Sequence, residues 1–280
     1  MATIAQLLRQ GSQALASVSQ SPNLDTELLL AHALNKPRAH LHAWPEKRVE
    51  DPLLSCFHQL LQRRLQGEPI AYLLGTKEFW SREFYVNSAV LIPRPETELL
   101  VEHTLALIPK DCPVLVADLG TGSGAIALTL GLERPNIQVV ATDRSLKALK
   151  VASENVQRHR ANNVHLCQAN WLSSFRPSSF DLIVSNPPYI APDDPHLNRG
   201  DVRFEPRSAL AADKNGLAAL QTIGAQARRC LKPGGWLIVE HGWDQRPAVA
   251  RIFESLGYQE VTCFSDWQNH PRVTRAQWSS

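Results

Sequence analysis

Apolar side chains recur at helical spacing through the first quarter of the chain. The runs 3–19, 24–34 and 52–66 place apolar residues three and four positions apart and contain few β-branched residues. This spacing is typical of amphipathic helices. We therefore predict a small helical bundle, in which Asp25 caps the second helix and Gly67 ends the last one.

The pattern changes after Pro69. Two runs, 70–80 and 83–86, resemble strands around a polar turn, so we expect a hairpin that joins two domains. Beyond it, apolar runs alternate with helical stretches, which predicts a doubly wound parallel sheet with ligands at the carboxyl ends of its strands. The strand-like runs lie near 114–118, 138–142, 164–168, 181–185 and 236–240, and residues 257–278 resemble two last strands.

A glycine-rich segment follows the first strand of this predicted sheet and precedes a helical run. Gly120, Gly122 and Ala125 satisfy the pattern G-x-G-x-x-A of dinucleotide-binding turns. Glycines at these positions permit positive φ angles and a close approach of the backbone to a ligand. The candidate cofactor-binding residues of the segment are Asp118, Gly120, Thr121, Gly122, Ser123 and Gly124.

Asp143 follows the next strand, roughly 20 residues beyond the first glycine, where an acidic side chain can accept hydrogen bonds from both hydroxyls of a ribose. NAD and S-adenosylmethionine both carry such a ribose. Capping of the helical stretch 145–158 is an alternative role for Asp143, and the two roles can coexist.

The strand near 181–185 ends in the sequence Asn186-Pro187-Pro188-Tyr189. Prolines fix φ and have no N–H, so the carbonyl oxygens of Asn186 and Pro187 stay free to face a pocket. Together with the side-chain oxygen of Asn186 they can accept both protons of a planar NH2 group while the Tyr189 ring packs on its flat face. An ordinary Pro-Pro turn is the structural alternative, but the position at a strand end of this sheet favours binding.

The composition narrows the class of protein. A chain of 280 residues that is 44% hydrophobic can bury a full core, and a net charge of +2 is far from the strongly basic balance of a duplex-binding protein. The five cysteines form no Cys-x-x-Cys pair, so we expect reduced thiols, no metal site and a cytoplasmic location. The sequence contains neither a secretory signal pattern nor an apolar run of the roughly 20 residues that a membrane span needs.

The ordered combination of motifs resembles the PrmC/HemK family, S-adenosylmethionine-dependent enzymes that methylate a glutamine side-chain amide in class I peptide-chain release factors. The resemblance covers nearly the whole chain. It rests on Pro93–Glu98, Asp118–Gly124 with Asp143, Asn170-Trp171, Asn186–Tyr189, Phe204–Pro206 with Ala209-Leu210, and Glu240–Gly242.

The resemblance implies a class I methyltransferase fold, with a sheet of seven strands of which the last is antiparallel. Residues 93–280 then carry the methyltransferase domain and 76–92 form a hairpin linker. Because residues 1–75 carry no chemistry yet precede a complete catalytic domain, we predict that they recognise the protein substrate. Asn186, Pro187 and Tyr189 are then catalytic, and Pro188 adds to the substrate site. Trp171 packs on adenine, whereas Asn170 replaces an acidic residue often found there. Thr97 or Glu96 starts a helix, and Glu205 and Glu240 are taken as structural.

Such an enzyme needs geometry more than a strong base, because an amide nitrogen becomes acidic only as methyl transfer proceeds. We expect release factors as partners, with no nucleic acid and no membrane, and a monomeric protein. Adenine-N6 methylation of DNA or RNA is the alternative activity, since it uses a similar tetrapeptide. A non-catalytic nucleotide-binding module would have no need of Asn186–Tyr189.

Overall fold

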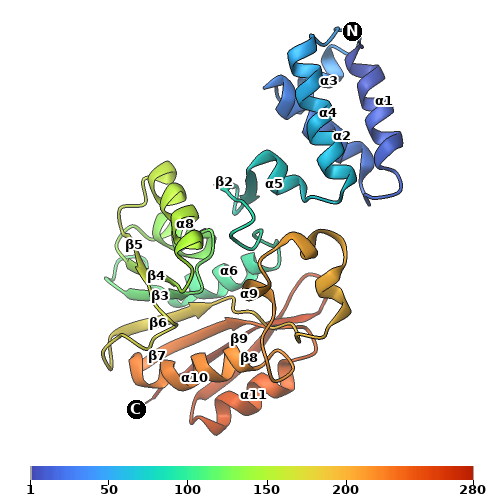
Figure 1. Ribbon diagram of the computed structural model, residues 1–280. Coiled ribbons are helices and arrows are strands. Elements are labelled where there is room, and N and C mark those ends of the chain that lie inside the picture. The colour runs from blue at the N-terminus through green and yellow to red at the C-terminus, as the bar shows by residue number, and fades with distance from the viewer. Residues whose placement is uncertain (1, 280) are drawn as a thin grey trace. The chain divides into compact units, whose positions relative to one another are not determined.

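A computed structural model describes residues 2–279, and Figure 1 traces the chain. The chain forms two compact units. The first comprises Met1–Thr76 together with Gly200–Phe204, and the second comprises Lys77–Arg199 and Glu205–Ser280. A short internal segment therefore belongs to the N-terminal unit, although the elements on either side of it belong to the C-terminal unit.

The first unit is helical, as its sequence pattern predicts. Its helices are α1 (Ile4–Leu15), α2 (Pro22–Leu34), α3 (Arg38–Ala43), α4 (Asp51–Leu65) and α5 (Ile70–Leu74). A capping box between Thr3 and Gln6 starts α1. Leu7, Leu29 and Phe57 are fully buried where the helices meet, so the bundle has a core of its own.

Three local expectations for this unit need correction. Asp25 does not cap α2, because the N-cap is Ser21, and Asp25 lies one turn inside the helix as the partner of the buried Arg64. The sequence analysis missed α3, which is only six residues long. The first half of the run 70–80 is helical and ends at Gly75, whose φ is 72°, because the apolar residues there face the bundle core rather than a sheet. Gly67, with a φ of 92°, does follow the end of α4 as expected.

The buried Arg64 also holds the internal segment within the first unit. Its Nε donates to Asp25 Oδ2 at 2.8 Å and its Nη1 to Asp201 Oδ1 at 2.9 Å. Arg203 adds a hydrogen bond from Nη2 to the carbonyl oxygen of Gln66 at 2.8 Å. The segment Gly200–Phe204 is a 3₁₀ helix, so its anchoring comes from these side chains rather than from a sheet ladder.

The second unit is built on a seven-stranded sheet with the order β5-β4-β3-β6-β7-β9-β8. β9 is antiparallel to both of its neighbours, and the other pairings are parallel. The predicted sheet is thereby confirmed, including its antiparallel last strand. The strands are β3 (Leu115–Leu119), β4 (Gln138–Asp143), β5 (Val164–Gln168), β6 (Phe180–Ser185), β7 (Leu231–Glu240), β8 (Gln259–Ser265) and β9 (Pro271–Gln277).

Helices cover both faces of this sheet and enclose two apolar cores (Figure 1). On one face pack α6 (Thr97–Leu107), α7 (Ala125–Glu133) and α8 (Leu146–His159), and on the other α10 (Ala218–Cys230) and α11 (Arg246–Ser255). The short α9 (Arg207–Leu210) follows the 3₁₀ helix Pro195–Asn198 and the segment Gly200–Phe204. Both faces are buried, which explains why β6 is almost continuously apolar.

The hairpin consists of β1 (Thr76–Phe79) and β2 (Arg82–Tyr85). Its residues Phe79 and Phe84 are buried in the core of the second unit and meet edge to face, with ring centroids 6.1 Å apart. Asn155 on α8 binds the backbone of Tyr85 through both its amide nitrogen and its amide oxygen. The hairpin is therefore an integral part of the sheet unit.

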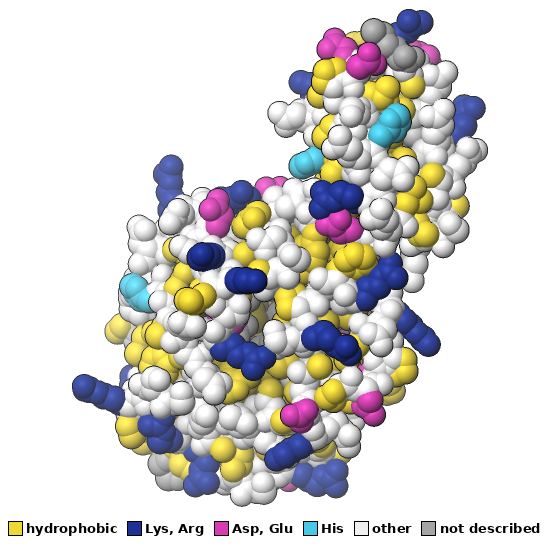
Figure 2. All heavy atoms as spheres, viewed as in Figure 1, with side chains coloured by type: hydrophobic (Ala, Val, Ile, Leu, Met, Phe, Trp, Pro, Cys, Tyr) yellow, Lys and Arg dark blue, Asp and Glu magenta, His cyan; other side chains and the backbone are white. Residues whose placement is uncertain are grey.

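No helix within residues 2–279 combines the length and the apolar composition that crossing a bilayer requires. Figure 2 shows Lys and Arg side chains dispersed over the displayed face among apolar and uncharged groups.

Candidate functional site

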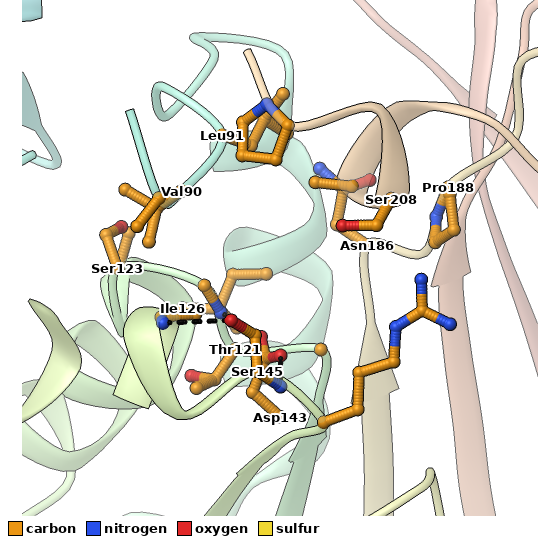
Figure 3. A pocket seen from close by; sticks show the side chains of 18 of the residues that line it. Val90, Leu91, Thr121, Ser123, Ile126, Asp143, Ser145, Asn186, Pro188 and Ser208 are labelled. Atoms are coloured by element: carbon orange, nitrogen blue, oxygen red, sulfur yellow. Dashed lines mark hydrogen bonds between the residues drawn. The ribbon is translucent and has the colours of Figure 1, made fainter. Parts of the chain in front are cut away.

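A pocket of the second unit lies where β3, β4 and β6 end (Figure 3). Asp143, Thr121, Ser123 and Ser145 come from one side of it, and Asn186, Pro188 and Ser208 from the other. The lining comprises 89–91, 93, 94, 97, 120–123, 125, 126, 143–145, 148, 169–171, 186, 188, 206, 208 and 209. The pocket thus brings together the glycine segment, Asp143, Trp171 and Asn186, which the sequence singled out separately.

The glycine segment forms a tight turn between β3 and α7. The N–H groups of Gly120 and Thr121 both donate to the carbonyl oxygen of Thr142, each at 2.8 Å. Gly120, Gly122 and Gly124 have φ angles of 72°, 56° and 84°, a region that side chains disfavour. A Cβ on Gly124 would lie 2.6 Å from a methyl carbon of Leu128, so a side chain here would require the buried Leu128 to move. Gly124 and Asp118 do not line the pocket themselves.

Asp118 holds the turn from beneath. Its side chain is fully buried, and Oδ2 accepts hydrogen bonds from the Thr121 hydroxyl at 2.6 Å and from the Ala127 N–H at 3.2 Å. Oδ1 is buried without a hydrogen-bond partner among the described residues. Burial raises the pKa of this carboxyl group to about 7, although the two hydrogen bonds oppose the shift. Asp118 therefore connects β3, the turn and α7.

Asp143 faces the glycine turn at the end of β4. Oδ2 accepts from the Gly122 N–H at 3.1 Å, and Oδ1 accepts from the Ser145 N–H at 2.8 Å. Ser145, and not Asp143, is the N-cap of α8, because its hydroxyl oxygen accepts from the Ala148 N–H. A carboxylate has about four lone-pair sites, so Asp143 retains acceptor capacity for a ligand in the pocket.

Trp171 follows β5 and lies against the same turn. Its φ is 52°, which is uncommon for a residue with a side chain. A Cβ on Gly120 would lie 3.2 Å from ring carbon Cζ3 of Trp171, so the indole and the turn pack closely. Asn170 is exposed at the same rim of the pocket. The indole therefore offers a flat apolar surface beside the glycine backbone.

Asn186–Tyr189 continue β6 beyond its last residue, Ser185, whose hydroxyl donates to the Leu119 carbonyl oxygen at 2.7 Å. Asn186 and Pro188 line the pocket, whereas Pro187 and Tyr189 do not. Within residues 2–279 no group donates a hydrogen bond to the carbonyl oxygens of Asn186 and Pro187 or to Asn186 Oδ1. Of the two residues that carry these three oxygens, only Asn186 lines the pocket, so the expectation that the Pro187 carbonyl oxygen faces it stays a prediction.

Glu240 and Thr97 carry a hydrogen-bond network behind this tetrapeptide that sequence reasoning missed. Asn186 Nδ2 donates to Thr97 Oγ1 at 3.0 Å, and Thr97 Oγ1 donates to Glu240 Oε2 at 2.7 Å. The Tyr189 hydroxyl donates to Glu240 Oε1 at 3.1 Å. Burial, together with the charge of Glu240, raises the pKa of Tyr189 far above its usual range, so Tyr189 keeps its proton.

Another buried carboxylate, that of Glu205, holds a different part of the pocket wall. Glu205 accepts hydrogen bonds from the Ile92 N–H at 3.3 Å and from Arg94 Nη2 at 2.5 Å. It thereby joins the segment that precedes α6 to the one that precedes α9, and both segments line the pocket. The sequence suggested only a structural role for Glu205, although its place in the motif Phe204–Pro206 was a signal.

Two family models and several known proteins are similar to this chain in sequence. Residues 6–75 match the family described as PrmC N-terminal domain, and residues 95–200 match the methyltransferase small domain. A release factor glutamine methyltransferase of Salmonella typhimurium is 50% identical over 91% of this chain and 92% of its own. The protein of that description from Vibrio cholerae is 47% identical over 99% of this chain and 98% of its own.

Solved structures agree on the fold. A methyltransferase from Pyrococcus furiosus superposes with a TM-score of 0.55 at 18% identity, covering 78% of this chain and 98% of its own. At this identity the likeness concerns the fold alone.

Proposed function

Because this chain belongs to the family of release factor glutamine methyltransferases, we propose that its pocket methylates the side-chain amide nitrogen of a glutamine in class I release factors, using S-adenosylmethionine. The observation that carries the assignment is the position of Asn186. Its unpaired Oδ1 lies in one pocket with the glycine turn and Asp143.

The residues present fit this cofactor. Asp143 has acceptor sites left for the ribose hydroxyls, Trp171 offers a flat surface for adenine, and the backbone of Gly120–Gly122 is open to a close approach. Asp118 then acts through the shape of the turn, since it does not line the pocket.

The amide of the substrate glutamine donates two hydrogen bonds in this proposal. Asn186 Oδ1 accepts one proton and the Pro187 carbonyl oxygen accepts the other, so the nitrogen is held with its lone pair toward the cofactor. When bound, S-adenosylmethionine supplies an electrophilic methyl group on a positively charged sulfur. With that group bound, Asn186 Oδ1 and the Pro187 carbonyl oxygen would hold the amide nitrogen for methyl transfer, and the proton that the nitrogen loses would leave to solvent.

Pro188 and Tyr189 shape the entrance for the substrate. Pro188 lines the pocket, and the Tyr189 carbonyl oxygen accepts from Gln245 Nε2 at 2.9 Å. This bond and the contact of the Tyr189 hydroxyl with Glu240 hold the tyrosine at both ends. The ring is thereby fixed as one side of the amide site, outside the part of the pocket that the cofactor would fill.

Residues 1–75 take the part of substrate recognition in this proposal, because the described residues of that unit include no part of the pocket. Residues 76–92 lie between it and the methyltransferase domain, 93–280, and their hairpin packs into the core of that domain. We further propose that the protein acts in the cytoplasm as a monomer and without nucleic acid. The net charge of +2 supports the last point.

Intact-mass measurement after incubation with S-adenosylmethionine tests the activity directly. A purified class I release factor should gain the mass of one CH2 group, and peptide sequencing should place it on a single glutamine. A variant of that release factor with the glutamine replaced should gain nothing. Methylation of an adenine-containing oligonucleotide instead would refute the proposal, and light scattering of the pure protein tests the monomer.

A further inference from the structure

We infer that Thr97 and Glu240 are positioning residues that set the orientation of the Asn186 side-chain amide, so that its oxygen and not its nitrogen faces the substrate. This inference rests on the proposed function. It concerns a choice that shape alone leaves open, because the two ends of an amide side chain have nearly the same size. A reversed amide would present N–H groups to a substrate NH2, which can only donate.

The direction of each hydrogen bond follows from proton counting. An ionised carboxylate only accepts, so the Thr97 hydroxyl must give its single proton to Glu240 Oε2, 2.7 Å away. Thr97 Oγ1 can then only accept from its other neighbour. That neighbour is the Asn186 amide at 3.0 Å, which must turn its NH2 toward Thr97. Oδ1 is left on the pocket side.

The carboxylate of Glu240 also holds Tyr189, the other residue at the proposed amide site. Glu240 Oε1 accepts from the Tyr189 hydroxyl at 3.1 Å, while Oε2 accepts from Thr97. Glu240 thus fixes Asn186 indirectly, through Thr97, and it fixes Tyr189 directly. Asn186 and Tyr189 lie on either side of the two prolines. Charge at Glu240 matters because a neutral acid carries a proton of its own and no longer forces Thr97 to donate.

Glu240 is 1% exposed at the end of β7. Burial raises its pKa to about 7, and the hydrogen bonds from Thr97 and Tyr189 together with the charge of Arg272 on β9 oppose that shift. Glu96, next to the start of α6, raises it further. The ionised, orienting form of Glu240 therefore predominates above pH 7 and is lost as the pH falls through that value.

Thr97→Val and Thr97→Ser form the matched pair that tests the inference. Valine keeps the shape of the buried side chain but removes the hydroxyl, whereas serine keeps the hydroxyl and loses one methyl group. At pH 8, kcat for release factor methylation should fall by about tenfold or more in Thr97→Val and stay within about threefold of wild type in Thr97→Ser. The dissociation constant for S-adenosylmethionine, measured by calorimetry, should change by less than about threefold in both.

Glu240→Gln supplies a readout that a merely structural contact would not move. In wild type, kcat/KM for release factor, measured with S-adenosylmethionine saturating, should drop on the acid side with a midpoint near pH 7. The glutamine variant should be slower at pH 8 and should lack this limb, because its amide cannot change protonation. Asp118, whose pKa is also raised to about 7, lies beneath the glycine turn. Its titration is therefore followed separately, through the dissociation constant for S-adenosylmethionine over the same pH range in both proteins.

Equal rates for Thr97→Val and Thr97→Ser would overturn the inference, and so would an acid limb that persists in Glu240→Gln. Failure of the wild-type protein to methylate a release factor would instead overturn the proposed function. The two failures are therefore distinguishable.

Discussion

Replacement of Asp143 by alanine probes the contact that we assign to the ribose of the cofactor. The Asp143 carboxylate accepts hydrogen bonds from the N–H groups of Gly122 and Ser145, and it keeps further lone pairs for a ligand. A hydrogen bond to a charged group contributes about 1.5–3 kcal/mol, so Asp143→Ala should weaken S-adenosylmethionine roughly 10- to 150-fold. Calorimetric titration of the purified protein measures this directly.

A cofactor analogue separates the ribose contact from damage to the turn. S-adenosylhomocysteine and its 2′,3′-dideoxy form should be titrated into both proteins. If Asp143 binds the hydroxyls, the variant should lose affinity for the first ligand and almost none for the second. Equal losses for both ligands would mean that the substitution acts through the Gly122 turn, and an unchanged affinity for the first would remove Asp143 from the site.

Asp181→Ala is the matched control for this experiment. Asp181 is also a carboxylate that accepts from a backbone N–H, that of Leu115 at 2.8 Å, and it pairs with Lys232. It lies at the start of β6, whereas the pocket lies beyond the end of this strand, and it does not line the pocket. Its loss should reduce thermal stability without changing the affinity for either ligand.

Three further predictions concern Asn186 at the proposed amide site, Arg64 in the N-terminal unit and the buried Glu240. Asn186→Ala should lower kcat by about tenfold to a hundredfold, because a proton donated by the substrate amide is left unpaired. Asn186→Asp keeps an acceptor and should retain clearly more activity in a radioactive methyl-transfer assay. Equal inactivity of the two variants with normal cofactor binding would contradict the acceptor role of Asn186. Arg64→Ala should destabilise the N-terminal unit by about 3–5 kcal/mol in urea unfolding, since it leaves Asp25 buried without its cation; a loss below about 1 kcal/mol would show that the pair is not needed. The raised pKa of Glu240 also predicts how the difference in unfolding free energy between wild type and Glu240→Gln depends on pH. This difference should favour wild type most below about pH 4.5 and should fall, by at most about 1.4 kcal/mol per pH unit, as the pH rises to 7. A difference that stays constant with pH would show that the pKa of Glu240 is not shifted.

Local sequence signals located most of the pocket. The glycine turn, Asp143 and Asn186–Tyr189 each follow an apolar strand, and parallel strands bring their carboxyl ends to one edge of the sheet. The sequence therefore predicted both the fold class and the meeting of these residues. Helix boundaries were less accurate where elements are short, as α3 and α5 show, because a few residues carry too little periodicity.

The chain's own pattern of apolar residues, glycines and prolines thus determined the sheet, the turn and the tetrapeptide, since these depend on neighbours in sequence. Only the tertiary structure decided which way the Asn186 amide points. Its orientation depends on Thr97, 89 residues away in the sequence, and Thr97 depends on Glu240, 143 residues farther on. The tertiary structure likewise decided that Asp201 belongs to the N-terminal unit, because Asp201 pairs with Arg64, from which it is separated by 137 positions in the sequence. Buried polar groups must find partners wherever folding places them, and no spacing in the sequence records that choice.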